Sequence, residues 1–219
     1  MTNKEYVQNL LLANDIIYID TSSLMNVEEF KVFIESYSED FLNFGMKITV
    51  TREVCLEIVK HLSSEHFEKQ TKAKRVIDIF KNFNTIFIFE DENLTSYEAN
   101  FAFADSELLS RMTKSKTDYK QLLITNDKNL CIDAFNLNTL NSCKGQQIMV
   151  CYINKNGKLH KGITEPLEKR ENKTVEAYEN SFADRTEELP GTPAKNTIKN
   201  CFFGACLLLV GFGLGKIVK

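Results

Sequence analysis

The sequence lacks the cysteine and histidine patterns of a zinc protein or a disulfide scaffold. Its six cysteines include no Cys-x-x-Cys pair, and its three histidines, His61, His66 and His160, are scattered along the chain. We therefore expect neither a structural zinc site nor a disulfide framework, and a reducing compartment is the simpler setting. The first residues contain no apolar stretch, so we also expect no signal peptide.

An internal repeat and a strong excess of one charge are also missing. The 219 residues carry a net charge of −3, with a pI of about 5.7. This balance argues against non-specific coating of nucleic acid but is compatible with a local basic groove. The length and the hydrophobic content of 43% suit one globular domain with a further segment appended.

Proline is absent from residues 1–165, and all three prolines lie between 166 and 193. Together with the polar composition around them, this predicts a flexible linker over residues 161–200 that follows a folded domain over residues 1–160. The remaining segment, 201–219, is a hydrophobic C-terminal segment.

The hydrophobic segment is expected to anchor the chain in a membrane. Residues 201–215 carry no charge, and a helix over 201–218 would be about 27 Å long, close to the roughly 30 Å of a bilayer core. Lys195 and Lys199 precede the segment, which predicts a single C-terminal pass with the folded domain on the cytoplasmic side. The alternative is a C-terminal helix packed on the domain, although such a helix should be amphipathic.

Within residues 1–160, short apolar runs alternate with helical patterns, which predicts an α/β fold with a parallel sheet flanked by helices in three layers. Asn26 and Glu29 have the spacing of a capping box at the start of one helix, and Thr51 is a candidate N-cap for the next. The expected strands and helices are, in order, helix 4–13, strand 16–19, helix 26–38, strand 47–50, helix 52–62, helix 65–82, strand 85–89, a helix from 104, strand 121–124, a helix after 127, and strand 147–153.

Two of the expected strands end on an aspartate. Ile16–Ile19 runs into Asp20, and Leu122–Ile124 runs into Thr125-Asn126-Asp127. The carboxyl ends of parallel strands lie on one edge, so the two carboxylates could be neighbours that a cation holds together. All-oxygen ligation favours Mg or Mn. The alternative is that each aspartate only caps the helix that follows it.

Two further acidic residues and one basic stretch are candidates for the same site. Glu57 lies at the border of the apolar face of its helix, and Asp105 lies in the first turn of another. The ordinary explanation for Glu57 is a solvated glutamate. The ordinary explanation for Asp105 is a carboxylate that lies near a helix N-terminus. The basic stretch is a candidate for phosphate contact, or else a solvated loop; it consists of Arg111, Lys114, Lys116 and Lys120.

The order of these four acidic residues resembles the PIN-domain family of metal-dependent ribonucleases. The matching pieces are Ile-Asp20-Thr-Ser-Ser-Leu, Val-Cys-Leu-Glu57-Ile, Ala-Asp105-Ser-Glu-Leu-Leu and Ile-Thr-Asn-Asp127-Lys-Asn-Leu. The resemblance covers about residues 14–153, and its first and last motifs are the most specific.

The resemblance implies an acidic quartet around Mg or Mn that hydrolyses RNA phosphodiesters. Asp20 and Asp127 would be direct metal ligands, Asp105 would bind or orient a second metal, and Glu57 would complete the shell or position water. Ser22 and Thr125 match the hydroxyl positions that support the site. Many relatives carry another acidic residue where this chain has Asn129, a departure that argues against a strong second metal site.

Three classes of function are therefore compared. The favoured class is a membrane-tethered endoribonuclease with a toxin-like, defence or RNA-processing role, whose partners would be RNA, the membrane through residues 201–218, and a protein inhibitor or a second copy of the chain. The second is an inactive PIN-fold module that binds RNA or a protein at the membrane. The third, a DNA-directed 5′-nuclease, is disfavoured because residues 154–200 offer no core for an added DNA-binding module.

Overall fold

The computed structural model describes residues 2–92, 94–100 and 102–162. Except for Lys161 and Gly162, the expected linker and the hydrophobic segment lie outside these residues. No helix in the described ranges is both long enough and apolar enough to cross a membrane.

The described residues form a six-stranded sheet with helices on both faces, which confirms the predicted α/β class. The strand order is β3-β2-β1-β4-β5-β6, and only β6 runs antiparallel to its neighbour. The strands are β1 Ile16–Ile19, β2 Ile48–Val50, β3 Phe87–Phe89, β4 Gln121–Ile124, β5 Ile148–Ile153 and β6 Leu159–Lys161.

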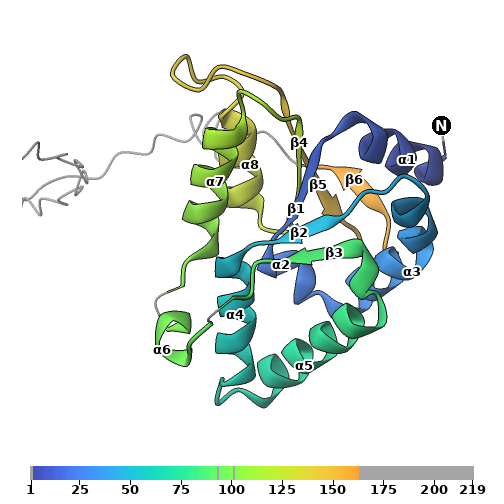
Figure 1. Ribbon diagram of the computed structural model, residues 1–219. Helices are drawn as coiled ribbons and strands as arrows, with labels where there is room; N and C mark the ends of the chain where they lie inside the picture. The colour runs from blue at the N-terminus through green and yellow to red at the C-terminus, as the bar shows by residue number, and fades with distance from the viewer. Residues whose placement is uncertain (1, 93, 101, 163–219) are drawn as a thin grey trace, which may run out of the picture. The chain divides into compact units, whose positions relative to one another are not determined.

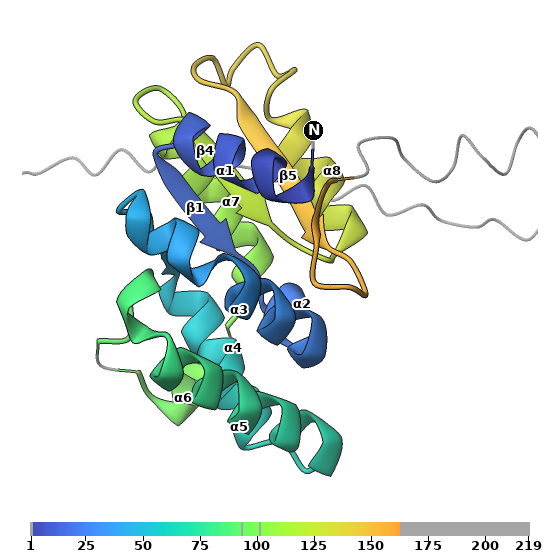
Figure 2. The ribbon, with the colours of Figure 1, turned by 90° about the vertical axis from the view of Figure 1, so that its right-hand side faces the viewer.

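Helices pack against both faces of the sheet (Figures 1 and 2). Figures 1 and 2 show α1 and α3 on one side of the sheet, and α7 and α8 on the other. The helices are α1 Asn3–Ala13, α2 Thr21–Leu24, α3 Val27–Asn43, α4 Arg52–Leu62, α5 Phe67–Asn82, α6 Ser96–Ala99, α7 Ala104–Ser115 and α8 Lys128–Asn136, with a 3-10 turn at Asn84–Ile86.

The strand order places β1 directly beside β4. Ile19 pairs in register with Ile124, and the backbone N–H of Asp20 donates to the Ile124 carbonyl at 3.0 Å. The chain leaves β1 toward β2 on one side and returns at β4 on the other. In open α/β sheets this reversal opens a crevice at the carboxyl ends of the two strands.

Several local features differ from the sequence predictions. The predicted capping box at Asn26 is wrong, because the Asn26 side chain makes no cap hydrogen bond to α3. Thr51 is the N-cap of α4 by position, but its side chain also makes no cap bond. Helix α2, a single turn that begins immediately after Asp20, was not predicted from the sequence.

A tight turn follows β5 and leads into the strand β6, which was not predicted from the sequence. Asn154 Oδ1 accepts hydrogen bonds at 2.9 Å from the backbone N–H groups of Asn156 and Lys158. Gly157 has φ +66°, and a Cβ there would meet the side chain of Val32 on α3. A glycine is needed at this position because the turn combines a left-handed backbone with a close approach to a helix.

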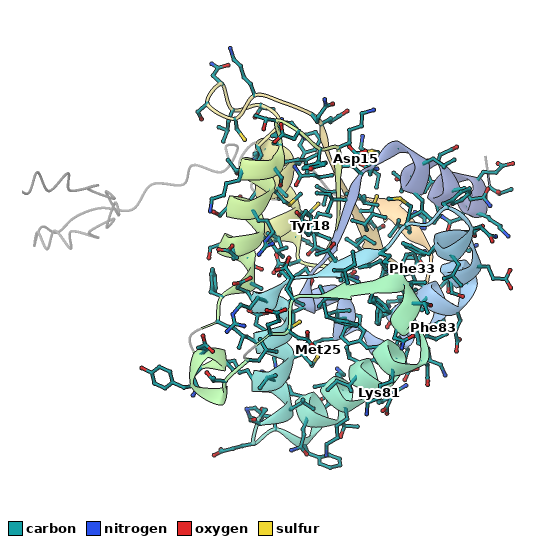
Figure 3. The ribbon with its side chains drawn as sticks, in the orientation of Figure 1. Asp15, Tyr18, Met25, Phe33, Lys81 and Phe83 are labelled. Atoms are coloured by element: carbon teal, nitrogen blue, oxygen red, sulfur yellow. The ribbon has the colours of Figure 1, made fainter. Side chains whose placement is uncertain are left out.

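An aromatic cluster on α3 fills the core on one side of the sheet. Phe33 is fully buried on the inner side of α3 (Figure 3), with its ring 5.4 Å from Tyr37 and 6.2 Å from Phe41. Rings at these separations add to the free energy gained by burying their surface.

We predict that Phe33→Ala lowers the free energy of unfolding by about 3–5 kcal/mol, because it opens a cavity that its close-packed neighbours cannot fill. The matched control is Phe67→Ala, since Phe67 is 79% exposed. Urea denaturation followed by circular dichroism measures both. Equal losses for the two variants would contradict this description of the core.

Candidate functional site

The four predicted acidic residues line one cavity at the carboxyl ends of β1 and β4. They come from four separate parts of the chain: the end of β1, helix α4, the start of α7, and the turn after β4. The cavity has a volume of about 400 Å³. Its charged and hydroxyl-bearing side chains are Asp20, Thr21, Ser22, Glu57, His61, Lys69, Lys72, Asp105 and Asp127.

Asp20 is the most deeply buried of the four, with 2% of its surface exposed. Its Oδ2 accepts hydrogen bonds from the Ser22 hydroxyl at 2.5 Å, the Ser22 backbone N–H at 3.1 Å and the Thr125 hydroxyl at 3.1 Å. Burial raises the pKa of Asp20, and the charge of Glu57 raises it further, while the hydrogen bonds lower it. The carboxylate is thus held in place by three donors that all reach the same oxygen.

Ser22 connects the turn after β1 to the turn after β4. Its hydroxyl oxygen accepts hydrogen bonds from the backbone N–H groups of Asn126 at 3.1 Å and Asp127 at 3.0 Å while it donates to Asp20. Thr125 acts similarly, because its hydroxyl donates to Asp20 and accepts from the Asp127 backbone N–H at 3.0 Å. Two hydroxyl groups therefore fix the two aspartates relative to each other.

Asp127 is the N-cap of α8. Its Oδ1 accepts hydrogen bonds from the backbone N–H groups of Asn129 at 2.7 Å and Leu130 at 3.1 Å. Asp20 caps α2 in the same way through Ser22. The capping explanation is therefore correct for both aspartates. It does not compete with ligand binding, because each carboxylate has a second oxygen that can face the cavity.

Glu57 and Asp105 form the other acidic side of the cavity. Glu57 Oε1 accepts a hydrogen bond at 3.1 Å from the backbone N–H of Ala104, the first residue of α7. This bond fixes the start of α7 and with it the neighbouring Asp105. Burial raises the pKa of Asp105 to about 6, and the negative charges of Asp20, Asp127, Glu57 and Asp133 contribute in that order. The members of the quartet are thus close enough to repel one another.

The donor chemistry of the cavity fits a hard divalent cation. Carboxylate and hydroxyl oxygens are the ligands that Mg and Mn prefer, and a cation would relieve the repulsion that raises the pKa of Asp105. In the described residues, however, no three His, Cys, Asp or Glu side chains stand close enough together to hold one ion as they are. The side chains would therefore have to move inward to bind an ion, or bind it through water.

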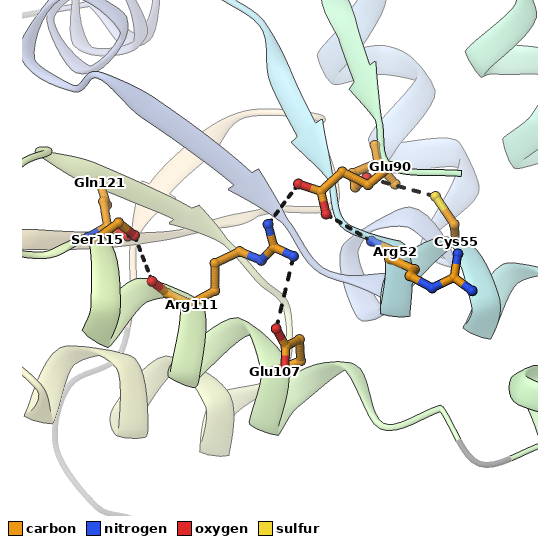
Figure 4. Close-up of polar contacts among 8 residues, drawn as sticks. Arg52, Cys55, Glu90, Glu107, Arg111, Ser115 and Gln121 are labelled. Atoms are coloured by element: carbon orange, nitrogen blue, oxygen red, sulfur yellow. Dashed lines mark hydrogen bonds and ion pairs between the residues drawn. The ribbon is translucent and has the colours of Figure 1, made fainter. Parts of the chain in front are cut away.

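The predicted basic patch is not formed as one surface. Lys116 is only 3% exposed. Arg111 pairs with Glu90 at 2.7 Å and with Glu107 at 4.0 Å, as Figure 4 shows. Lys114 and Lys120 are exposed, and none of the four lines the acidic cavity. This arrangement does not favour one phosphate-contact surface made by the four residues, and their contact with RNA stays a prediction.

The sequence reading missed three basic residues that do line the cavity, namely His61 on α4 and Lys69 and Lys72 on α5. Nothing in the local sequence shows that α5 passes the acidic residues, so the two lysines could not be assigned to the site from the sequence. Burial lowers the pKa of His61, and the charge of Lys69 lowers it further. The negative charge of Glu57 acts in the opposite direction on the pKa of His61.

Comparison of the chain with protein-family models, with curated proteins and with solved structures found no match. The fold and the site define the chain as an α/β protein with an acidic cavity at the carboxyl edge of its sheet. Any more specific function has to be inferred from the four motifs and the geometry of this cavity.

We predict that Asp105→Asn stabilises the metal-free chain at pH 7.5 by about 1–2 kcal/mol, after a discount for solvent screening at this half-buried position. The folded-state pKa of about 6 lies above the unfolded value. The contribution of Asp105 to stability is therefore fully present below about pH 4 and is lost as the pH rises through 6.

The difference in unfolding free energy between the variant and the wild type should therefore grow between pH 4 and pH 7, as measured by urea denaturation in EDTA. Asp78→Asn, at an exposed position on α5, is the control. A difference that does not change with pH would show that Asp105 is not repelled by its neighbours.

Proposed function

We propose that the chain is a Mg- or Mn-dependent endoribonuclease of the PIN-domain type, tethered to a membrane by its C-terminal segment. The observation that supports this most strongly is that Asp20, Glu57, Asp105 and Asp127 line a single cavity between the ends of β1 and β4. The same four residues carry the sequence resemblance, in the same order. A strand-end crevice is also where α/β proteins bind their ligands.

The site would work by placing an RNA phosphodiester and a water molecule beside a cation. Asp20, Asp105 and Asp127 would hold the cation, which would polarise the phosphate and lower the pKa of the bound water. Glu57 is held by the Ala104 N–H through one oxygen, so its other oxygen can accept a proton from the attacking water. A new P–O bond would form from that water, the bond to the leaving ribose oxygen would break, and that oxygen would take up a proton from solvent, while Glu57 later releases its own.

The hydrogen bonds around Asp20 suit this role. Ser22 and Thr125 occupy its Oδ2, which leaves Oδ1 for the cation. Because the same two hydroxyls accept hydrogen bonds from the turn that carries Asp127, they hold two of the proposed ligands at a fixed spacing. Pre-organised ligands lose less conformational freedom when the ion binds.

The alternative is a catalytically inactive module that binds RNA or a protein partner. The absence of a ready-made metal-binding group among the described residues favours this alternative. The two functions differ in their products, since the module would retain RNA without shortening it.

We predict that the full chain cleaves single-stranded RNA only when Mg or Mn is present, and that Asp20→Asn and Asp127→Asn each reduce the rate by at least about 10²-fold. Each substitution removes a ligand charge and keeps the shape of the side chain. Gel analysis of labelled RNA and DNA with and without EDTA gives the rates and the substrate class.

The control is Asp118→Asn, because Asp118 is exposed and does not line the cavity. It should cleave at the wild-type rate. Cleavage by Asp127→Asn at the wild-type rate would refute the proposed metal site, and RNA bound but uncut by the wild type would favour the inactive module.

The membrane tether rests on the sequence of residues 201–218, which lie outside the described residues. We predict that the full chain pellets with membranes and resists carbonate extraction, while a chain ending at Asn200 stays in the supernatant. Cell fractionation followed by immunoblotting measures this. A full chain that remains soluble without detergent would contradict the tether and leave the proposed nuclease chemistry unaffected.

A further inference from the structure

The acidic cavity has a basic side that the four family-like motifs do not include. Lys69 and Lys72 on α5 line it together with the acidic quartet. Residues three apart on a helix lie on the same face, so both lysines can reach into the cavity from one direction. The acidic residues come instead from the ends of β1 and β4 and from α4 and α7.

The change from acidic to basic can be followed along α4. Glu57 and His61 are one helical turn apart on the same face, and both line the cavity. Lys69 is close enough to His61 for its charge to lower the pKa of the imidazole. The cavity therefore runs from a carboxylate, past an imidazole, to an ammonium group.

The two lysines differ in how their charge is compensated. Lys72 forms an ion pair with Glu68 at 2.7 Å, and both side chains are substantially exposed. An exposed pair of this kind is weak and can be exchanged for another anion. Among the described residues, the side chain of Lys69 forms neither an ion pair nor a hydrogen bond, so its ammonium group is free to bind a ligand.

We propose that Lys69 and Lys72 form a phosphate subsite that binds the RNA backbone next to the phosphate being cleaved. This inference rests on the proposed nuclease function and names the surface that would hold the substrate. In this proposal Lys69 and Lys72 contact the phosphate in place of the basic stretch from Arg111 to Lys120, because Lys116 is buried and Arg111 is paired with Glu90.

The subsite defines the path that an RNA strand would take across the cavity. Four carboxylates would repel a polyanion, and two lysines offset only part of that charge, so RNA binding should also need a divalent cation. With a cation at the carboxylates and two ammonium groups on α5, successive phosphates of one strand would each meet positive charge. The strand would then cross the cavity from the ends of β1 and β4 toward α5.

The test measures binding of a short fluorescein-labelled single-stranded RNA to the full chain by anisotropy, with Mg present. All variants carry Glu57→Gln, which removes the proposed proton acceptor but keeps the three carboxylates that would hold the cation, so that the RNA is bound but not cut. Lys69→Ala and Lys72→Ala should each weaken binding about tenfold, the effect of losing one charge-assisted hydrogen bond. The slope of log affinity against log salt should fall by about 0.7 for each lysine removed.

Two sets of variants serve as controls. Lys74→Ala removes an exposed lysine of the same helix that bonds to Gln70 instead of lining the cavity, and it should bind as the parent does. Lys69→Arg and Lys72→Arg keep the charge and should restore most of the affinity.

Wild-type affinity in Lys69→Ala and Lys72→Ala, or an equal loss in Lys74→Ala, would overturn the subsite. So would a parent chain that does not bind RNA. The cleavage assay on the chain with Glu57 intact is read separately, so RNA that is bound through these lysines but never cut would reject the nuclease and keep the subsite.

Discussion

Mutual repulsion among four carboxylates is the constraint that the structure around the cavity has to withstand. Asp20 is almost completely buried, and burial together with Glu57 raises its pKa. The charges of three other quartet members raise the pKa of Asp105. A fold that brings such groups together loses stability unless hydrogen bonds or a cation compensate. The groups that offset this repulsion therefore indicate which kind of ligand the cavity binds.

Part of the compensation comes from the protein itself. Ser22 and Thr125 donate to Asp20, and backbone N–H groups of α8 donate to Asp127. These bonds satisfy one oxygen of each aspartate. Among the described residues, no hydrogen bond of this kind reaches the Asp105 carboxylate, and burial together with the neighbouring negative charges raises its pKa.

The aspartates at the strand ends could be predicted from the sequence, because each follows an apolar run and parallel strands end at one edge. That these two strands are neighbours could not be predicted locally, since the order β3-β2-β1-β4 depends on how the helices pack. The basic residues show the same limit. Lys116 is close to Lys114 in sequence but is buried, while Lys69 reaches the cavity only because α5 packs beside α4.

The central claim is that these carboxylates bind a divalent cation, and the thermal unfolding of the full chain with increasing Mn tests it most directly. A ligand that binds only the folded state raises its stability by about 2.7 kcal/mol at a concentration of 100 times its Kd. The unfolding midpoint should therefore rise with Mn in the wild-type chain and stay constant in Asp20→Asn. A midpoint that does not respond to Mn, or that rises equally in both chains, would contradict the claim.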